Sequence, residues 1–204
     1  MIWIEIAIAI GVIVLIAHYM LTKKKDQFET SLIASHLDTS IEMKRTLAMG
    51  LYMRFCKEDA EKPKTISSIY LKEDPYLFED FVAKVIVRAK GGSAYVTGAS
   101  NDYGVDIEHT SSDGLYLGQV KCYMGDLSFN SIALIHSNMV KQGAVGGFVV
   151  TTGCFTQNAK KYAEGLNIEL INGVSLVEYW LEGLSQKEAQ LQKFNLVENP
   201  TSTI

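Results

Sequence analysis

The stretch that most constrains the fold is residues 103–123, which read YGVDIEHTSSDGLYLGQVKCY. Two apolar, strand-like runs meet there at an Asp-Gly turn signal and predict a β-hairpin. Side chains alternate between the two faces of a strand, so Gln119 and Lys121 share one face. A four-residue loop would place Asp106 opposite Gln119, and a two-residue turn would place it opposite Lys121. In either register an acid, an amide and an amine lie on one face, within about 5 Å across the strands.

An amphipathic helix is predicted before the hairpin, in PYLFEDFVAKVIVRAKG from Pro75. The apolar side chains recur at three- and four-residue steps and form one broad stripe, made of Leu77, Phe78, Phe81, Val82, Val85, Ile86 and Ala89. Asp80, Lys84 and Arg88 lie on the far side, where water solvates them. Glu79 falls on the edge of the stripe and is the acid directed toward the sheet, although a salt-bridged surface position is the competing interpretation.

Short strands and helices alternate through the rest of the chain. SAYVTG precedes the hairpin as a strand, and a helix from Leu127 to Gly143 follows it, with Leu127, Ile132, Ile135 and Met139 inward. GGFVVTT is typical of a strand buried on both faces, and TQNAKKYAEGL predicts a helix capped by Thr156. NIELIN and SLVEYWLEGL predict a last strand and a last helix. This order predicts an α/β fold in which helices flank a mixed β-sheet.

The first part of the chain predicts a transmembrane anchor. Residues 2–21 are predominantly apolar, with a single acid, Glu5, near the outer end. At 1.5 Å of rise per residue about 20 residues span about 30 Å of hydrocarbon. Three lysines follow directly, at 23–25, so the positive-inside rule places the C-terminal side in the cytoplasm. A cleavable signal peptide fits less well, because its positive charges would precede the apolar run.

Residues 23–64 predict one or two amphipathic helices that end in the charged boundary KEDAEKPK. They could form a spacer or a dimerising stalk, which would make the protein a homodimer, or a helical subdomain packed on the main core. The predicted organisation is therefore an anchor at 1–22, a helical spacer at 23–64, a main domain at 65–184 and a tail at 185–204. The three cysteines lack the spacing of a disulfide framework or a zinc site, which fits a reducing compartment.

Five motifs occur in order between Phe78 and Tyr179, over about half of the chain. They are an FE pair at Phe78-Glu79, VTGxSxDxGVDI at 96–107, QxK at 119–121, FVVTTGxFTxxA at 148–159 and ELINGxxL at 169–176. In this order and spacing they resemble the Mrr-like restriction endonuclease domain of the PD-(D/E)xK nuclease superfamily. Two positions depart from the usual pattern: Tyr103 stands where glycine is usual, and Asn172 stands where aspartate is commoner.

The resemblance implies a restriction-endonuclease-like fold with an active centre made of Glu79, Asp106, Gln119 and Lys121. Asp106 would be the main ligand of a divalent metal ion, Mg²⁺ or Mn²⁺, helped by the Val120 carbonyl or the Gln119 amide oxygen and completed by Glu79. Lys121 would orient the attacking water and offset negative charge that develops on the phosphate. The competing interpretation is a cross-strand ion pair of Asp106 and Lys121 without chemistry.

The apolar N-terminal run and the resemblance together predict a membrane-anchored, metal-dependent DNA endonuclease that acts on foreign or modified DNA. The alternatives are a catalytically inactive module that binds DNA or a partner at the membrane, and a structure-specific resolvase or repair nuclease. From Thr65 onward the chain has 10 Lys plus Arg against 15 Asp plus Glu, so contacts that neutralise phosphates must be local. The candidates for these contacts are Lys84, Arg88, Lys90, Lys141, Lys160 and Lys161.

Overall fold

The computed structural model describes residues 11–16, 18–22, 24, 40–56, 74, 76–98 and 103–198, with side chains up to 185. The chain divides into two compact units, 1–41 and 42–204. In the first unit the described residues 11–16, 18–22 and 24 are helical. Across the described part of the chain, no helix is both long enough and apolar enough to cross a membrane. Residues 1–10 and 17 of the predicted anchor, and all of the predicted boundary KEDAEKPK, lie outside the described residues.

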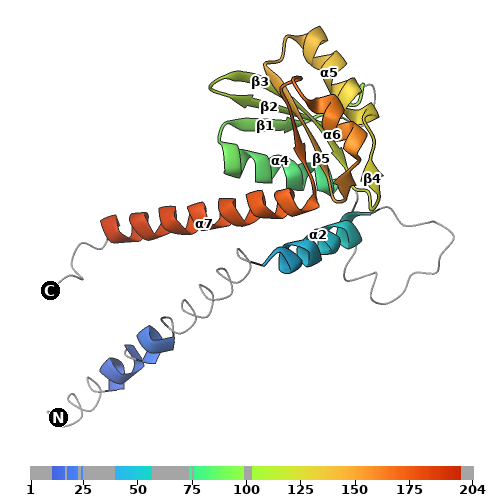
Figure 1. Ribbon diagram of the computed structural model, residues 1–204. Coiled ribbons are helices and arrows are strands. Elements are labelled where there is room, and N and C mark those ends of the chain that lie inside the picture. The colour runs from blue at the N-terminus through green and yellow to red at the C-terminus, as the bar shows by residue number, and fades with distance from the viewer. Residues whose placement is uncertain are drawn as a thin grey trace, which may run out of the picture. The chain divides into compact units, whose positions relative to one another are not determined.

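A five-stranded mixed sheet forms the centre of the second unit (Figure 1). Its strands, in spatial order, are β1 (Ser93–Val96), β2 (Ile107–Ser111), β3 (Gly114–Lys121), β5 (Gly146–Thr151) and β7 (Ile168–Ile171). The pairs β1–β2 and β2–β3 are antiparallel, and the pairs β3–β5 and β5–β7 are parallel. Two short strands, β4 (Asp126–Leu127) and β6 (Cys154–Phe155), pair separately in parallel. The mixed sheet that the sequence predicts is therefore confirmed.

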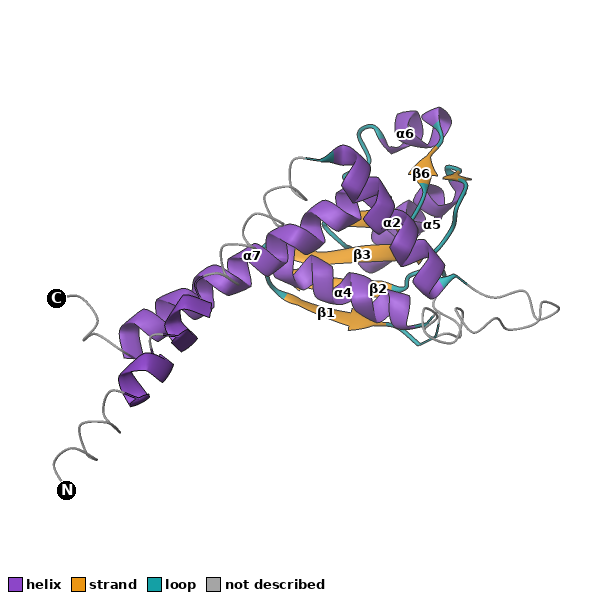
Figure 2. Ribbon diagram, turned by 90° about the horizontal axis from the view of Figure 1, so that it is seen from below, coloured by secondary structure: helices purple, strands orange, loops and turns teal. Residues whose placement is uncertain are grey.

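Helices cover both faces of the sheet. Their bounds are α2 Ile41–Phe55, α4 Leu77–Lys90, α5 Asn130–Gln142, α6 Gln157–Ala163 and α7 Gly173–Glu198. One buried apolar cluster joins α2, α4 and α7 to one face of the sheet, and another joins α5 and α6 to the opposite face. Figure 2 shows α2, α4 and α7 crossing in front of the strands, with α5 behind them. The buried strand side chains thus belong to one of two separate cores, according to the face they occupy.

The stripe predicted for α4 is largely confirmed. Phe78, Val82, Val85 and Ile86 are buried, and the predicted outer residues are exposed. Leu77 is an exception, because this first residue of the helix is 44% exposed. The helix begins two residues later than the predicted start at Pro75.

The helix that follows the hairpin is shorter than predicted, and the last helix is longer. Ile132, Ile135 and Met139 are buried as expected, but Leu127 lies in β4 and not in α5. The cap of α6 is confirmed, because the Thr156 hydroxyl accepts a hydrogen bond from Ala159 N at 3.1 Å. The helix α7 continues to Glu198, past the predicted end of the domain at 184.

Residues 41–55 form a helix that packs on the main core, as in the second of the two interpretations of this stretch, and not a separate spacer or stalk. Ala48, Leu51 and Phe55 of α2 are at most 5% exposed and belong to the core formed with α4 and α7. The Phe55 ring lies 5.3 Å from the ring of Phe78, measured between centroids. Lys44 Nζ also donates a hydrogen bond to Glu178 Oε1 at 2.9 Å, which links α2 to α7. This stretch is therefore part of the main folded unit.

Candidate active site

The hairpin has a defined register. Thr110 pairs with Leu115 and Ile107 pairs with Gly118, which is the register predicted for the four-residue loop. Ser111 and Gly114 form one further pair, so only Ser112 and Asp113 remain in the turn. Asp106 directly precedes β2, and in this register it lies opposite Gln119 at the far end of the hairpin from the turn.

The carboxylate of Asp106 takes part in the sheet's hydrogen-bond ladder. Asp106 N donates to Gly118 O at 2.8 Å, and Thr97 N donates to Asp106 O at 3.0 Å, so the backbone is bound on both sides. Its Oδ2 accepts the backbone N–H of Val120 at 2.7 Å, where a strand carbonyl would otherwise stand. Because main-chain groups on both neighbouring strands hold it, this buried acid is fixed in one position.

Lys121 and Asp106 are brought together as the sequence predicted. Lys121 Nζ lies 3.8 Å from Asp106 Oδ2. The two side chains differ in environment, since that of Asp106 is 9% exposed and that of Lys121 is 44% exposed. The amine therefore reaches the buried acid from the solvent side. An ion pair of this kind with one exposed partner stabilises a fold by at most about 1 kcal/mol, too little to explain a buried acid by stability alone.

Gln119 carries the unsatisfied polar atom of this region. The residue is 3% exposed, and its buried Oε1 has no hydrogen-bond partner within the part of the chain that the structure describes. Its amide group packs against Gly104, where an added Cβ would lie 2.9 Å from Gln119 Nε2 and 2.2 Å from Leu134 Cδ2. A buried carbonyl oxygen without a donor costs about 1–3 kcal/mol, which a cation or an ordered water would recover.

Glu79 joins Lys121 at a pocket of about 320 Å³. The two charged residues share its wall with the following residues: Tyr52, Phe55, Cys56, Phe78, Val120, Cys122 and Tyr123. Glu79 is half-buried there, so the predicted direction toward the sheet agrees with its position at the pocket. The contribution of α2 through Tyr52, Phe55 and Cys56 was not predicted, because its apolar spacing shows a buried face but not what that face covers.

The donors near the end of β3 fit a hard divalent cation with few protein ligands. Asp106 supplies a carboxylate, and Gln119 supplies a buried amide oxygen that lacks a donor. Val120 and Glu79 line the adjoining pocket. Among the described residues no three His, Cys, Asp or Glu side chains gather as a metal site. An ion held here would therefore keep several waters, as Mg²⁺ usually does.

Local backbone geometry accounts for both departures from the usual motif, one in the loop before β2 and one at the start of α7. Tyr103 has φ of +51°, a left-handed conformation that glycine adopts without strain, which accounts for the usual glycine at this position. The Tyr103 carbonyl accepts a hydrogen bond from Asn138 Nδ2 at 3.1 Å. Asn138 is buried, and the sequence did not single it out. Asn172 Oδ1 accepts from Val174 N and Ser175 N at the start of α7, a cap that aspartate would make equally well.

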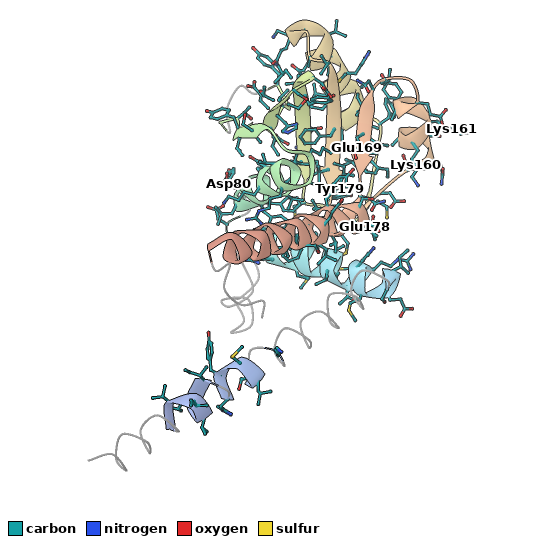
Figure 3. The ribbon with its side chains drawn as sticks, turned by 90° about the vertical axis from the view of Figure 1, so that its left-hand side faces the viewer. Asp80, Lys160, Lys161, Glu169, Glu178 and Tyr179 are labelled. Atoms are coloured by element: carbon teal, nitrogen blue, oxygen red, sulfur yellow. The ribbon has the colours of Figure 1, made fainter. Side chains whose placement is uncertain are left out.

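The six predicted phosphate-binding residues do not form one surface. Lys84, Arg88 and Lys90 lie on α4, whereas Lys141 lies on α5 and the other two on α6, across the sheet. Figure 3 shows Lys160 and Lys161 at the opposite side of the unit from Asp80 on α4. Lys141 Nζ lies 4.4 Å from the centroid of the Tyr103 ring, which places this cation beside the loop that leads to Asp106.

A larger pocket of about 550 Å³ lies at the hairpin turn, away from Asp106. It is lined by residues that include Lys90, His109, Asp113 and Glu169. Lys90 and the Tyr179 hydroxyl both donate hydrogen bonds to Glu169. Burial raises the pKa of Tyr179, and the Glu169 carboxylate adds to this shift. These two contacts of Glu169 hold β7 to α4 and α7.

Comparison with known proteins places the chain in a family. Residues 70–180, more than half of the chain, match the family model Mrr_cat, described as restriction endonuclease. The chain belongs to this restriction endonuclease family. The match contains all four predicted active-centre residues. It leaves out α2, which the structure nevertheless places at the candidate active site of this restriction endonuclease domain.

Two solved structures are similar to the chain. The MspJI restriction endonuclease in complex with a 27-mer oligonucleotide is 20% identical, with a TM-score of 0.44, over 62% of this chain and 34% of that chain. The DNA modification-dependent restriction endonuclease AspBHI is 14% identical, with a TM-score of 0.48, over 76% of this chain and 40% of that chain. The chain thus matches less than half the length of either. No curated protein sequence matches it.

Proposed function

We propose that this protein is a metal-dependent DNA endonuclease that hydrolyses phosphodiester bonds. The family membership supports a nuclease, and the arrangement of Asp106, Lys121 and Glu79 supports an active centre at the end of β3. The observation that carries the proposal is the buried Asp106 carboxylate, 3.8 Å from an amine that lines a pocket shared with Glu79. The foreign or modified DNA that restriction endonucleases cut is the proposed substrate.

The active-centre residues have different proposed roles in hydrolysis, namely metal binding and orientation of the attacking water. Asp106, held by the Val120 N–H, and the Gln119 amide oxygen would hold Mg²⁺ or Mn²⁺, with the Val120 carbonyl and Glu79 beside them. A bound divalent cation neutralises charge on the phosphate and lowers the pKa of a bound water. Lys121 orients the attacking water and places a positive charge where negative charge develops on the phosphate. Glu79 accepts a hydrogen bond from that water or completes the oxygen donors.

Duplex binding is expected to be weak without further contacts. The chain from Thr65 onward has 10 basic against 15 acidic residues, and the six candidate cations are divided between the two faces of the sheet. Each phosphate contact therefore acts locally and adds to affinity in a salt-dependent manner.

A membrane tether is part of the proposal. The apolar residues 2–21 and the lysines at 23–25 support an inner-membrane anchor with the nuclease domain in the cytoplasm. A nuclease held there would meet DNA as it enters the cell. Fractionation of cells that express the full chain, before and after replacement of residues 2–21 by a soluble helix, tests the tether separately from catalysis.

Cleavage assays test the proposed chemistry. The purified full chain should nick or cut plasmid DNA with Mg²⁺ and should fail with EDTA, and methylated and unmethylated plasmid side by side show which is preferred. Glu79→Gln should lower the rate at least about tenfold if Glu79 contacts the reacting water. Asp80→Asn is the matched control, because this exposed neighbour on α4 lies outside the pocket. Equal rates for wild type and Asp106→Asn would contradict the proposal.

An inactive binding module is the second candidate. The absence of a third acid among the described residues around Asp106 favours it, since the site holds less negative charge for a metal ion. DNA binding by the full chain without cleavage of any plasmid or oligonucleotide in Mg²⁺ or Mn²⁺ would select this alternative.

A further inference from the structure

We propose that Tyr123 contacts the substrate by stacking on an unstacked base next to the scissile phosphate. This inference rests on the proposed nuclease function and names its substrate class. It predicts that the enzyme prefers DNA with an unpaired nucleotide at the cut site, such as a single strand or a bubble, over perfect duplex. Tyr123 plays no part in any motif of the sequence.

Tyr123 follows Lys121 by two residues and leaves the end of β3 at the candidate active pocket. Its side chain lines that pocket together with Lys121 and Glu79. The residue is 53% exposed, and its ring lies against Gly125, where an added Cβ would be 2.8 Å from Tyr123 Cε1. A DNA strand whose phosphate reaches Lys121 would bring its neighbouring nucleoside against this ring.

The backbone of Tyr123 is held through both its N–H and its carbonyl by one buried side chain, that of Thr152. Tyr123 N donates to Thr152 Oγ1 at 2.9 Å, and the same hydroxyl donates to Tyr123 O at 2.9 Å. Thr152 is 7% exposed and its own N–H donates to Lys121 O at 3.3 Å. The adjoining chain is tightly packed, since a Cβ on Gly153 would lie 2.8 Å from Tyr123 O. A rigid backbone with an exposed ring can bind a ligand with little loss of conformational entropy.

Stacking would also provide DNA affinity in a domain that has more acidic than basic residues. Electrostatic attraction to DNA is weak here, because acidic residues outnumber basic ones and the candidate cations lie on two faces. Stacking of a base on an aromatic ring strengthens binding about 5- to 150-fold and does not depend on phosphate charge. In a perfect duplex both faces of each base are covered by neighbours, so the ring can stack only on a base that has left the helix.

Binding and cleavage are measured separately, so that the inference and the proposed function can fail independently. Anisotropy of a labelled single strand, a bubble and a perfect duplex, in EDTA, reports the binding contact without catalysis. Tyr123→Ala should raise the dissociation constant for the single strand and the bubble by about 5- to 150-fold, the equivalent of 1–3 kcal/mol. Tyr123→Phe should bind within about twofold of wild type, and Tyr123→Trp at least as tightly, because a larger ring stacks better.

Two controls distinguish a stacking contact of Tyr123 from a general effect of removing a surface tyrosine or a phosphate contact. Tyr95→Ala removes a tyrosine that is 67% exposed on β1, outside the pocket, and should leave affinity unchanged. The slope of affinity against salt should be the same for wild type and Tyr123→Ala, since no phosphate contact is lost. Unchanged affinity in Tyr123→Ala, loss of affinity in Tyr123→Phe equal to that in Tyr123→Ala, or tighter wild-type binding to perfect duplex would each overturn the inference. If Tyr123→Ala fails to fold, weaker binding by Tyr123→Trp than by wild type would overturn it.

Discussion

The carboxylate of Asp106 accepts the backbone N–H of Val120 at 2.7 Å, so an acid at the candidate active site also completes the pairing of two strands. This contact separates the structural role of the residue from its chemical role. An asparagine can still accept the N–H through its carbonyl oxygen, whereas an alanine cannot.

Asp106→Asn should therefore keep stability and lose activity, while Asp106→Ala should lose both. The alanine leaves the Val120 N–H without its acceptor, which costs about 1–3 kcal/mol in the free energy of unfolding. Urea unfolding of the two variants measures this difference, and plasmid nicking should fall at least about 100-fold in both. Equal stability of the two variants would show that the hydrogen bond has no structural role.

Mg²⁺ should raise the melting temperature of the wild-type protein, because an ion that binds only the folded state stabilises it. Asp106→Asn should abolish this shift. Lys121→Ala should retain or enlarge the Mg²⁺-induced shift, since the substitution removes a positive charge 3.8 Å from the proposed ligand atom. The same substitution should lower the cleavage rate about 100-fold. Calorimetric melting with Mg²⁺ and with EDTA distinguishes the two residues. A lost Mg²⁺ shift in Lys121→Ala would contradict the separate roles.

Gly104→Ala should destabilise the domain and disturb the site at once. Gly104 has φ of +81°, and an added Cβ would lie 2.2 Å from Leu134 Cδ2 and 2.9 Å from Gln119 Nε2. The strain and the overlap together should cost more than about 1 kcal/mol, and the displaced Gln119 should weaken the Mg²⁺ response. Gly143→Ala is the matched control, because its φ is also left-handed but an added Cβ there meets nothing within 4 Å. Equal melting temperatures for the two variants would contradict the overlap.

Phe55→Ala should show that α2 belongs to the catalytic unit. The side chain is 2% exposed and its ring contacts the rings of Phe78 and Phe81. Its removal should cost about 3–5 kcal/mol, the usual range for a buried phenylalanine. A chain that starts at residue 65 lacks all of α2 and should be less stable still. Met53→Ala, at an exposed position of the same helix, should change the free energy of unfolding by less than about 0.5 kcal/mol.

Tyr179→Phe should be less stable than wild type near neutral pH, by about 1 kcal/mol for the lost hydrogen bond to Glu169. Burial raises the pKa of Tyr179 above its ordinary value of 10.0, so the folded state keeps the proton that the unfolded state loses. The contribution of Tyr179 is complete below pH 10 and declines as the pH rises further. Unfolding at pH 7 to 11 should thus show the difference between the two proteins shrinking above about pH 10. A constant difference would contradict the shift.

The sequence predicted those features that depend on local periodicity. The stripe on α4, the buried strand β5 and the cap at Thr156 follow from spacing and side-chain chemistry, and the structure confirms them. The alternation of the hairpin strands also predicts that Asp106 and Lys121 lie close together, and their charged atoms are 3.8 Å apart. Each of these features lies within one element or between two elements adjacent in the chain, so the regular geometry of a helix or hairpin determines which residues are close together.

Features that depend on contacts between distant segments could not be predicted. Nothing in the spacing of α2 shows that Phe55 meets Phe78 or that Tyr52 lines the pocket. Thr152 and Asn138 each hold a distant loop through a single side chain, at Tyr123 and Tyr103 respectively. A buried threonine or asparagine has many local uses, so its sequence position does not reveal a partner about 30 residues away.

The strand that carries Gln119, Val120 and Lys121 is the middle one of the five, paired on both sides. Fraying starts at sheet edges and helix ends, whereas central strands open only when the whole domain unfolds. The amide hydrogens of β3 should therefore be among the last to exchange with deuterium. The spacing between acid and amine should then persist almost to the melting point, so that heat would abolish catalysis in one cooperative step and not by gradual loosening.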